Sequence, residues 1–347
     1  MMQNSFGVWF PAIRTGTGTD LYTLRLVDAL SRRGVKAGIT WLPRRAEYLP
    51  WSVRKPPTPA WADLVHVNSW LHPHFISSDL PIIATIHSCV HDECLSSYKS
   101  FSQALYHDNW VYKIEHQVVS SARLVTAVSE YSALVAGKAF RRSDVIPVHN
   151  WIDTEQFAPR RTQESHRPFR LLYVGSMIIR KGVDLLLNIM EALGGGYELL
   201  FTGEMVDLEK YGSVPANIRP IGRVHGDRNL ATLYNDCDAL LFPSRLEGFG
   251  LVALEAAACG LPVIASRSSS LPEVILDGET GFLCDVDDVE KFVEAARRLK
   301  EDARLCERLS RNARIRAATL FSEDKAIDAY LEIYRKALES PTPTFMS

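Results

Sequence analysis

At 347 residues, the chain is long enough for two domains, each with its own hydrophobic core. Its 46% hydrophobic and 23% charged residues are typical of a soluble globular protein, and a net charge of −2 excludes a general affinity for polyanions such as nucleic acid. Six cysteines in this length do not form a disulfide scaffold, and no apolar run is long enough to cross a membrane. Because the N-terminus lacks the pattern of a signal peptide, we expect a cytoplasmic protein.

Apolar runs alternate with amphipathic segments in the first half of the chain, which predicts a parallel sheet covered by helices. A helix is predicted at 20–31 from the spacing of its leucines. The strands are predicted at 6–10, 35–41, 63–67, 81–87, 124–128 and 145–148.

The apolar pattern lapses from 151 to 168 and then resumes, so we place a domain boundary there. The predicted division is an acceptor-side domain at 1–158, a donor domain at 159–322, and a C-terminal helix with a flexible tail at 323–347. That helix is predicted to cross back to the first domain. Predicted strands of the second half are 170–174, 197–202, 217–221, 239–242 and 262–265, and predicted helices are 182–193, 229–235, 251–258, 289–300, 303–319 and 323–338.

The most informative segment carries two acidic residues, Glu247 and Glu255, around a Gly-Phe-Gly turn that opens a helix. The start of such a helix has unpaired backbone N–H groups and the positive end of the helix dipole, which favour phosphate. Glu247 can accept hydrogen bonds from sugar hydroxyls, and Glu255, about two turns further along, can reach a ribose. This arrangement predicts a nucleotide-sugar site. The backbone contacts are assigned to Gly248, Phe249, Gly250 and Leu251.

With the strand before it and the Ala-x-Gly-x-Pro-Val-Ile run after it, this segment resembles the Glu-x7-Glu motif of retaining glycosyltransferases of family 4. The resemblance spans nearly the whole chain. It implies an α/β fold of the GT-B type, with two Rossmann-like domains whose parallel sheets face each other across a deep cleft. It also implies sugar transfer from a nucleoside diphosphate donor. We expect no divalent metal or other cofactor, because Arg180, Lys181 and the start of the helix can offset the charge of the diphosphate, and we find no Asp-x-Asp after a predicted strand that would hold Mg²⁺ on it. The alternative for the two carboxylates is a pair of solvated helix residues.

A second segment has a strand ending at Gly175 and two adjacent cations, Arg180 and Lys181, just before a helix. The guanidinium of Arg180 can bind two phosphate oxygens at once, whereas Lys181 acts as a point charge. In the resembled family, these two hold the donor diphosphate and stabilise it as it leaves. Solvated cations are the simpler alternative.

In the first half, Gly16 and Gly18 lie in a threonine-rich loop, and His87 ends a predicted strand. The loop resembles the family's glycine loop, whose amides approach the donor phosphate, although an ordinary strand-to-helix turn would look the same. The resemblance places His87 against the donor sugar at the reaction centre. The aspartate that usually follows is Ser88 in this chain.

The same histidine lies within eight residues of Cys89, His91 and Cys94, which raises the alternative of a zinc site. Their spacing is not that of a standard zinc finger, and no second ligand pair follows nearby. We therefore predict no metal ligands.

Two further segments match the family less closely. Arg223 and Val224 resemble the loop that contacts the nucleobase, largely through its backbone, so the identity of the base stays open. Trp151 replaces a glycine that the family usually has at the domain junction, with consequences for closure or acceptor shape that stay open.

Segment 41–61 mixes three tryptophans with four cations. One interpretation is an interfacial membrane contact or a lipid-linked acceptor. The other, which we favour at this stage, is a proline-broken surface loop whose tryptophans anchor it to the core. Residues 1–150 carry 15 Lys/Arg against 11 Asp/Glu, an excess that fits an anionic acceptor but also ordinary scatter.

The prediction is a hexosyltransferase that moves a sugar from a UDP or GDP donor to a glycan or lipid-linked acceptor in bacterial surface glycan or glycolipid assembly. We expect it to be cytoplasmic, with peripheral contact to the inner membrane as an open possibility, and to bind no nucleic acid. The predicted catalytic residues are His87, Arg180, Lys181 and Glu247. The alternatives are a catalytically silent nucleotide-binding scaffold and a nucleotide-sugar epimerase or hydrolase of the same architecture.

Overall fold

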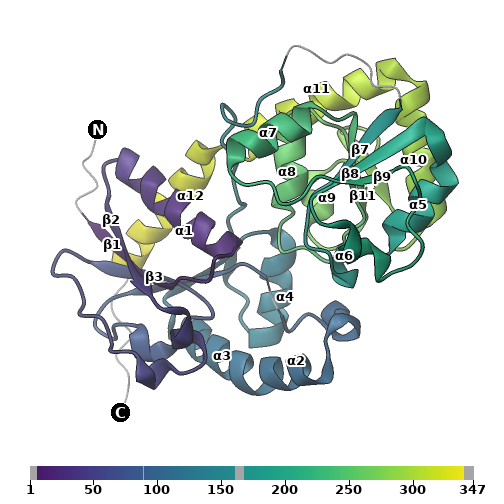
Figure 1. Cartoon of the computed structure of the whole chain (residues 1–347). Coiled ribbons are helices and arrows are strands. Elements are labelled where there is room, and N and C mark those ends of the chain that lie inside the picture. Colours follow the sequence, from purple (N-terminus) through teal and green to yellow (C-terminus); the bar gives the residue numbers. More distant parts are fainter. Residues whose placement is uncertain (1–5, 89, 161–167, 340–347) are drawn as a thin grey trace. The chain divides into compact units, whose positions relative to one another are not determined.

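The computed structural model describes residues 6–88, 90–160 and 168–339. The chain divides into two compact units, which are described separately (Figure 1). The first unit contains the described residues up to His149 together with those from Glu323 onward. The second runs from Asn150 to Ser322.

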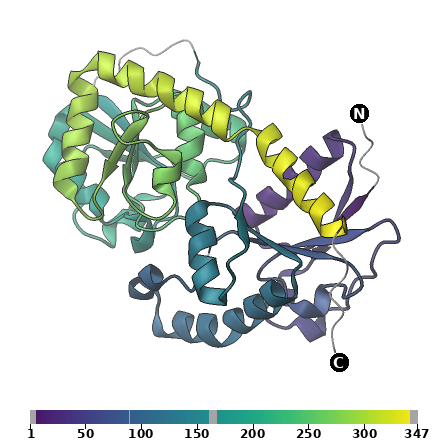
Figure 2. The same ribbon diagram turned by 180° about the vertical axis from the view of Figure 1, so that it is seen from behind.

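The first unit is built on a parallel six-stranded sheet in the order β2-β1-β3-β4-β5-β6. Alternate strand residues point to opposite faces, so Trp9 and Val65 pack on one side while Val8 and Leu64 pack on the other. Helices α1 and α12 cover one face, and α3 and α4 cover the other (Figure 2). The strands are β1 (Gly7–Ile13), β2 (Lys36–Leu42), β3 (Leu64–Asn68), β4 (Ile82–Ile86), β5 (Leu124–Ala127) and β6 (Val145–Pro147). The helices are α1 (Gly18–Arg32), α2 (Phe101–Tyr106), α3 (Tyr112–Ser121), α4 (Glu130–Phe140) and α12 (Glu323–Glu339).

The C-terminal helix α12 is held on this sheet by a buried polar network. The hydroxyl of Tyr334 lies 2.7 Å from Nδ1 of His66, whose Nε2 lies 2.6 Å from Oγ1 of Thr85. One turn earlier on α12, the hydroxyl of Tyr330 is hydrogen-bonded to that of Tyr22 on α1. These side chains are buried, so each hydrogen bond replaces one that water would otherwise supply.

The second unit repeats the architecture with a parallel sheet in the order β12-β11-β10-β7-β8-β9. Its core includes the fully buried Leu171, Leu186 and Phe292. Helix α8 is buried along most of its length, which suits its almost wholly apolar sequence. The strands are β7 (Phe169–Tyr173), β8 (Tyr197–Phe201), β9 (Ile218–Pro220), β10 (Ala239–Phe242), β11 (Val263–Ser266) and β12 (Gly281–Cys284). The helices are α5 (Leu185–Leu193), α6 (Met205–Glu209), α7 (Asp227–Asn235), α8 (Leu251–Ala258), α9 (Leu271–Val274), α10 (Val289–Glu301) and α11 (Ala303–Leu320).

Every strand predicted from the sequence is present, with its ends shifted by a few residues at most, but strand β12 was not predicted. This strand begins at Gly281, a residue that disfavours strands. A Cβ atom there would lie 2.4 Å from the carbonyl oxygen of Val263, so only glycine permits this pairing. Helices α2, α3, α4, α6 and α9 were also missed.

The structure divides the chain between His149 and Asn150, so the predicted boundary after residue 158 falls inside the second unit. Helix α12 belongs to the first unit and packs against α1 and β4. The predicted flexible tail lies outside the described residues, as do residues 161–167 of the segment that was used to place the boundary.

We expect the buried His66 to make stability depend on pH. Burial lowers the pKa of His66 to about 3, whereas an unfolded histidine titrates near about 6.5. Between these values the unfolded state binds more protons, so the free energy of unfolding should fall as the pH decreases from about 6.5, by up to about 1.4 kcal/mol per pH unit. Chemical denaturation at a series of pH values measures this slope.

The matched variant is His66→Gln, whose amide can still bond to Tyr334 and Thr85 but does not titrate. Its unfolding free energy should fall less steeply over the same pH range, because the other histidines contribute equally to both proteins. Equal slopes for the two proteins would contradict this account of His66.

Candidate active site

At the carboxyl edge of the second sheet, the loops after β7 and β10 bring three predicted residues together. The ammonium of Lys181 lies 2.5 Å from Oε1 of Glu247, and the guanidinium of Arg180 donates to the carbonyl of Leu246 at 2.8 Å. The Lys181 and Glu247 side chains are 17% and 10% exposed, so their ion pair is only partly screened by water. Two cations and a carboxylate therefore lie beside the start of α8.

The main chain of Glu247 is held by two neighbouring serines. Its N–H donates to Oγ of Ser269 at 2.8 Å, and its carbonyl accepts from Oγ of Ser270 at 3.2 Å. Ser269 adopts a left-handed conformation with φ of 47°, which is unfavourable for a residue other than glycine. Neither serine was predicted as part of the site, because nothing in a Ser-Ser-Ser run marks it as a support for a distant carboxylate.

The residue before helix α8 has a backbone conformation that favours glycine. Gly250 has φ of 94°, and a Cβ atom there would lie 2.8 Å from Leu271. Because Gly250 has no side chain, it cannot itself cap the first amides of the helix. Phe249 is 3% exposed and its ring packs edge-on against Phe321 at 5.6 Å, so its side chain anchors the turn. Gly248 and Leu251 are half-buried on either side.

The second acid of the motif, Glu255, lies on α8 and is buried. It is 7% exposed, and its Oε2 accepts a hydrogen bond of 2.9 Å from the hydroxyl of Tyr234 on α7. Burial and the carboxylate together raise the pKa of Tyr234, so the phenol stays protonated and continues to donate. A contact of Glu255 with a ribose remains a prediction.

Sequence analysis also missed Arg245, which ties the two loops together. Its guanidinium donates to both carboxylate oxygens of Asp184 at 2.7 and 2.8 Å and to Asp287 at 2.6 Å. The backbone N–H of Arg245 donates to the carbonyl of Arg180. The side chain is 7% exposed, which strengthens these bonds. An arginine two residues before Glu247 was the available signal.

The two loops also approach closely at Gly182. This residue has φ of 70°, and a Cβ atom there would lie 2.0 Å from the carbonyl oxygen of Pro243. Any other residue would push the Arg180–Lys181 turn away from β10.

The remaining residues predicted in this unit lie on neighbouring strand ends. The amide of Gly175, after β7, donates to Oγ1 of Thr202 at 3.2 Å. Arg223 is exposed and Val224 is half-buried after β9, two strands away from β7. Their predicted contact with a nucleobase is not tested by these positions.

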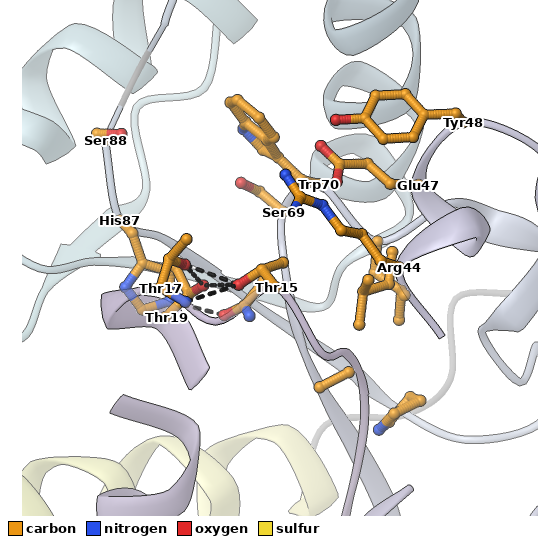
Figure 3. A pocket seen from close by; sticks show the side chains of 15 residues that line it. Thr15, Thr17, Thr19, Arg44, Glu47, Tyr48, Ser69, Trp70, His87 and Ser88 are labelled. Atoms are coloured by element: carbon orange, nitrogen blue, oxygen red, sulfur yellow. Dashed lines mark hydrogen bonds between the residues drawn. The ribbon is translucent and has the colours of Figure 1, made fainter. Parts of the chain in front are cut away.

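In the first unit, His87 follows β4 and lines a cavity of about 260 Å³ (Figure 3). Its Nε2 lies 2.6 Å from Oδ1 of Asn68, and the ring of Tyr22 packs edge-on against it at 4.5 Å. Burial lowers the pKa of His87 to about 4, so the imidazole is neutral near pH 7. A neutral ring that donates from Nε2 to Asn68 keeps Nδ1 as a hydrogen-bond acceptor.

Beyond His87, the cavity is lined by both aromatic rings and polar side chains. Figure 3 shows Trp70, Arg44, Glu47 and Tyr48 gathered on one side and the threonines of the glycine loop on the other. Ser69 and Ser88 also line it. Burial raises the pKa of Glu47, an effect that Arg44 partly offsets.

The backbone amides of the glycine loop are hydrogen-bonded to a carboxylate of the same chain. Asp20 accepts hydrogen bonds from the N–H groups of Thr15 at 3.0 Å and Gly16 at 2.8 Å, and from the Thr15 hydroxyl at 2.7 Å. Gly16 has φ of 75°, and Gly18 is the first residue of α1. The phosphate contact predicted for the Gly16 amide therefore requires that this amide exchange Asp20 for the phosphate.

The zinc alternative finds no support in the described part of the chain. Nε2 of His91 lies 2.9 Å from Oε2 of Glu115, and Cys94 is exposed. Cys89 lies outside the described residues, and among the others no three His, Cys, Asp or Glu side chains are grouped so as to hold a metal ion.

Trp151, which replaces the family's usual glycine, is buried, with 4% of its surface exposed.

None of the helices within the described ranges combines the length and the apolar character that crossing a membrane requires.

Comparison with known proteins matches residues 154–316 to the family "Glycosyl transferases group 1". The chain is 30% identical over 295 residues to the glycogen synthase of Mycobacterium tuberculosis, an alignment that covers 79% of this chain and 69% of that relative. It is 29% identical over 319 residues to the D-inositol 3-phosphate glycosyltransferase of Mycobacterium avium, covering 82% and 72% of the two chains.

Solved structures share the fold at low sequence identity. A sucrose-phosphate synthase from Thermosynechococcus elongatus superposes with a TM-score of 0.76 at 20% identity, covering 95% of this chain and 98% of the other. An Anabaena protein in complex with UDP and glucose superposes with a TM-score of 0.72 at 15% identity, covering 95% and 100%. The predicted GT-B fold, with two α/β units on parallel sheets, is thereby confirmed. The chain belongs to the glycosyl transferases group 1 family and is a transferase.

Proposed function

We propose that this chain transfers a sugar from a nucleoside diphosphate donor to a hydroxyl of a glycan or lipid-linked acceptor, with retention at the anomeric carbon, as a member of family 4. The observation that carries the proposal is the group formed by Arg180, Lys181 and Glu247 at the start of α8. This arrangement offers positive charge for a diphosphate and a carboxylate for sugar hydroxyls within one half-buried corner.

In this proposal, Arg180, Lys181 and the first amides of α8 stabilise the charge that grows on the departing diphosphate. Glu247 orients the sugar by accepting hydrogen bonds from its hydroxyls. Lys181 already neutralises that carboxylate, so a diphosphate that binds Lys181 also leaves Glu247 freer to accept from the sugar. Arg245 and Gly182 keep the two loops at the required separation. Glu255 is assigned to the ribose, and Arg223 and Val224 to the base.

His87 is assigned to the donor sugar near the reaction centre. Its neutral imidazole, fixed by Asn68, can accept a hydrogen bond at Nδ1 without placing a positive charge beside the oxocarbenium-like centre. The acceptor's proton is expected to pass to a donor phosphate oxygen, as the family resemblance implies.

We further propose that the transfer needs no divalent metal, because two cations can offset the charge of the diphosphate. An Asp-x-Asp pattern, Asp285 and Asp287, does follow β12, a strand that sequence analysis missed. Asp287 is ion-paired with Arg245 at 2.6 Å, so it already has a structural role. Added chelator should therefore leave the transfer rate unchanged.

The cavity of the first unit supports a sugar or polyol as the acceptor. An indole ring next to a carboxylate and a guanidinium, as in Trp70, Glu47 and Arg44, suits the apolar face and the hydroxyls of a pyranose. A role in assembling a bacterial surface glycan or glycolipid is consistent with this chemistry. A silent nucleotide-binding scaffold is the alternative, and the intact cluster around Lys181 disfavours it.

Donor binding is the first test. Calorimetric titration with UDP, GDP and ADP should show binding of at least one of them. The double variant Arg180→Ala and Lys181→Met should weaken it about tenfold or more, because each lost charge-assisted bond is worth about 1.5–3 kcal/mol. Lys210→Met, at an exposed lysine of the same unit, is the control. Absence of binding by all three nucleotides would contradict the proposal.

Glu247→Gln separates sugar transfer from nucleotide binding. We expect kcat to fall about 10²–10³-fold, while the affinity for the nucleoside diphosphate stays the same or rises, because Lys181 loses its partner. Glu209→Gln, at an exposed acid of the same unit, should leave both quantities unchanged. Nucleotide binding without transfer by the unmodified protein, on any donor and acceptor panel, would favour the scaffold.

Asn68→Asp tests the protonation state of His87. A carboxylate 2.6 Å from Nε2 should favour the imidazolium and raise the pKa of His87 from about 4. The acid limb of the pH profile of kcat/KM should then move to higher pH. The control is Asn109→Asp at an exposed site, which should not shift the limb. An unchanged limb in Asn68→Asp would rule out His87 as a neutral participant.

A further inference from the structure

The first unit exposes an unusual concentration of large hydrophobic side chains on two neighbouring segments. Tyr48, Leu49 and Trp51 follow the short 3-10 helix η1 (Arg44–Glu47), and their exposed fractions are 48%, 51% and 68%. Phe101 and Leu105 on α2 are 86% and 56% exposed. Leaving several such side chains in water costs free energy, and a cluster of them commonly marks an interaction surface. We call these five residues the aromatic patch.

The two segments of the aromatic patch are joined by ring contacts. The ring of Trp51 lies 6.0 Å from that of Trp110, and the ring of Tyr48 lies 6.0 Å from that of Tyr106. The indole N–H of Trp110 donates to the carbonyl of Glu47 at 3.3 Å. Tyr106 and Trp110 continue the helical run that carries Phe101 and Leu105. The exposed side chains therefore share one region of the surface.

Trp51 differs from the other tryptophans of segment 41–61. Trp41 lies under the guanidinium of Arg14 at 5.0 Å, and Trp61 lies under the ammonium of Lys36 at 5.4 Å. Both are partly buried against the sheet, as the core-anchoring interpretation predicts. Trp51 is the most exposed of the three and needs a different explanation.

The charges of segment 41–61, which carries three of the five patch residues, are mainly positive. Within segment 41–61, the cations Arg44, Arg45, Arg54 and Lys55 are all exposed, whereas the acid Glu47 is half-buried. Helix α2 carries no charged residue, and the exposed acid Asp108 follows it. A partner of complementary chemistry therefore presents negative charges at its surface and an apolar layer beneath them.

We propose that the aromatic patch docks the chain on an anionic phospholipid surface, with Trp51 and Phe101 inserted at the level of the glycerol backbones and the arginines on the lipid phosphates. A protein partner would more often offer a shaped complement to a groove, whereas these side chains project from a segment of short 3-10 turns and from a six-residue helix. Tyr48 also lines the His87 cavity, so docking places an acceptor held in the membrane close to that cavity. The inference goes beyond the proposed function.

The test uses the full chain and vesicles of phosphatidylcholine, with or without phosphatidylglycerol. Co-sedimentation should show binding to the mixed vesicles, weaker binding to phosphatidylcholine alone, and loss at high salt because the charges are screened. Trp51→Ser with Phe101→Ser should weaken binding about tenfold or more, as should Arg45→Glu with Arg54→Glu. These residues are exposed, so the variants should fold, which circular dichroism and unchanged nucleotide binding would verify.

Matched control variants lie in the other unit: Ile315→Ser removes an exposed hydrophobic side chain, and Arg304→Glu with Arg308→Glu reverses two exposed cations. Neither should change vesicle binding. The proposal is overturned if the unmodified chain ignores the vesicles, or if patch and control variants bind alike. It is also overturned if the patch variants only abolish self-association in gel filtration, which would assign the patch to a second copy. Vesicle binding without sugar transfer would instead refute the proposed function alone.

Discussion

The second unit of this protein depends on keeping two cations and one carboxylate together at the start of a helix. Like charges in a half-buried corner repel each other, so Arg180 and Lys181 need fixed partners. Glu247 supplies one partner and a backbone carbonyl supplies the other. Arg245 joins the two loops through Asp184 and Asp287, and Gly182 lets the chains approach closely enough for these bonds to form.

In the first unit, burial rather than ion pairing determines the state of the main candidate residue, His87. His87 is half-buried in the wall of the cavity, where burial keeps its imidazole neutral, and Asn68 fixes which nitrogen carries the proton. Tyr22, which packs against that ring, is hydrogen-bonded to Tyr330 of α12. The C-terminal helix therefore supports the residues behind the cavity, although it follows the whole second unit in the sequence.

The two proposals depend on different surfaces of the molecule. Sugar transfer rests mainly on buried or half-buried groups, such as Lys181, Glu247 and His87, whose side chains are held by hydrogen bonds. Membrane docking rests on side chains such as Trp51 and Phe101. These are mostly exposed and contribute little to the core, so they can be changed without loss of the fold. Segment 41–61 contributes to both, because Arg44 and Glu47 line the His87 cavity while Trp51 is exposed.

Local patterns in the sequence determined the two α/β halves, the strands and the Glu247–Glu255 segment, because apolar periodicity and glycine turns act over a few residues. They failed at β12, where Gly281 serves a contact with Val263 that no local pattern shows. Only the tertiary structure decided that the Gly16 amide donates to Asp20 and that Arg245 connects the loops after β7 and β10. The neutral state of His87 also follows from its burial in the fold. These outcomes depend on which groups meet across the fold and on how much water reaches them, and both are properties of packing rather than of sequence order.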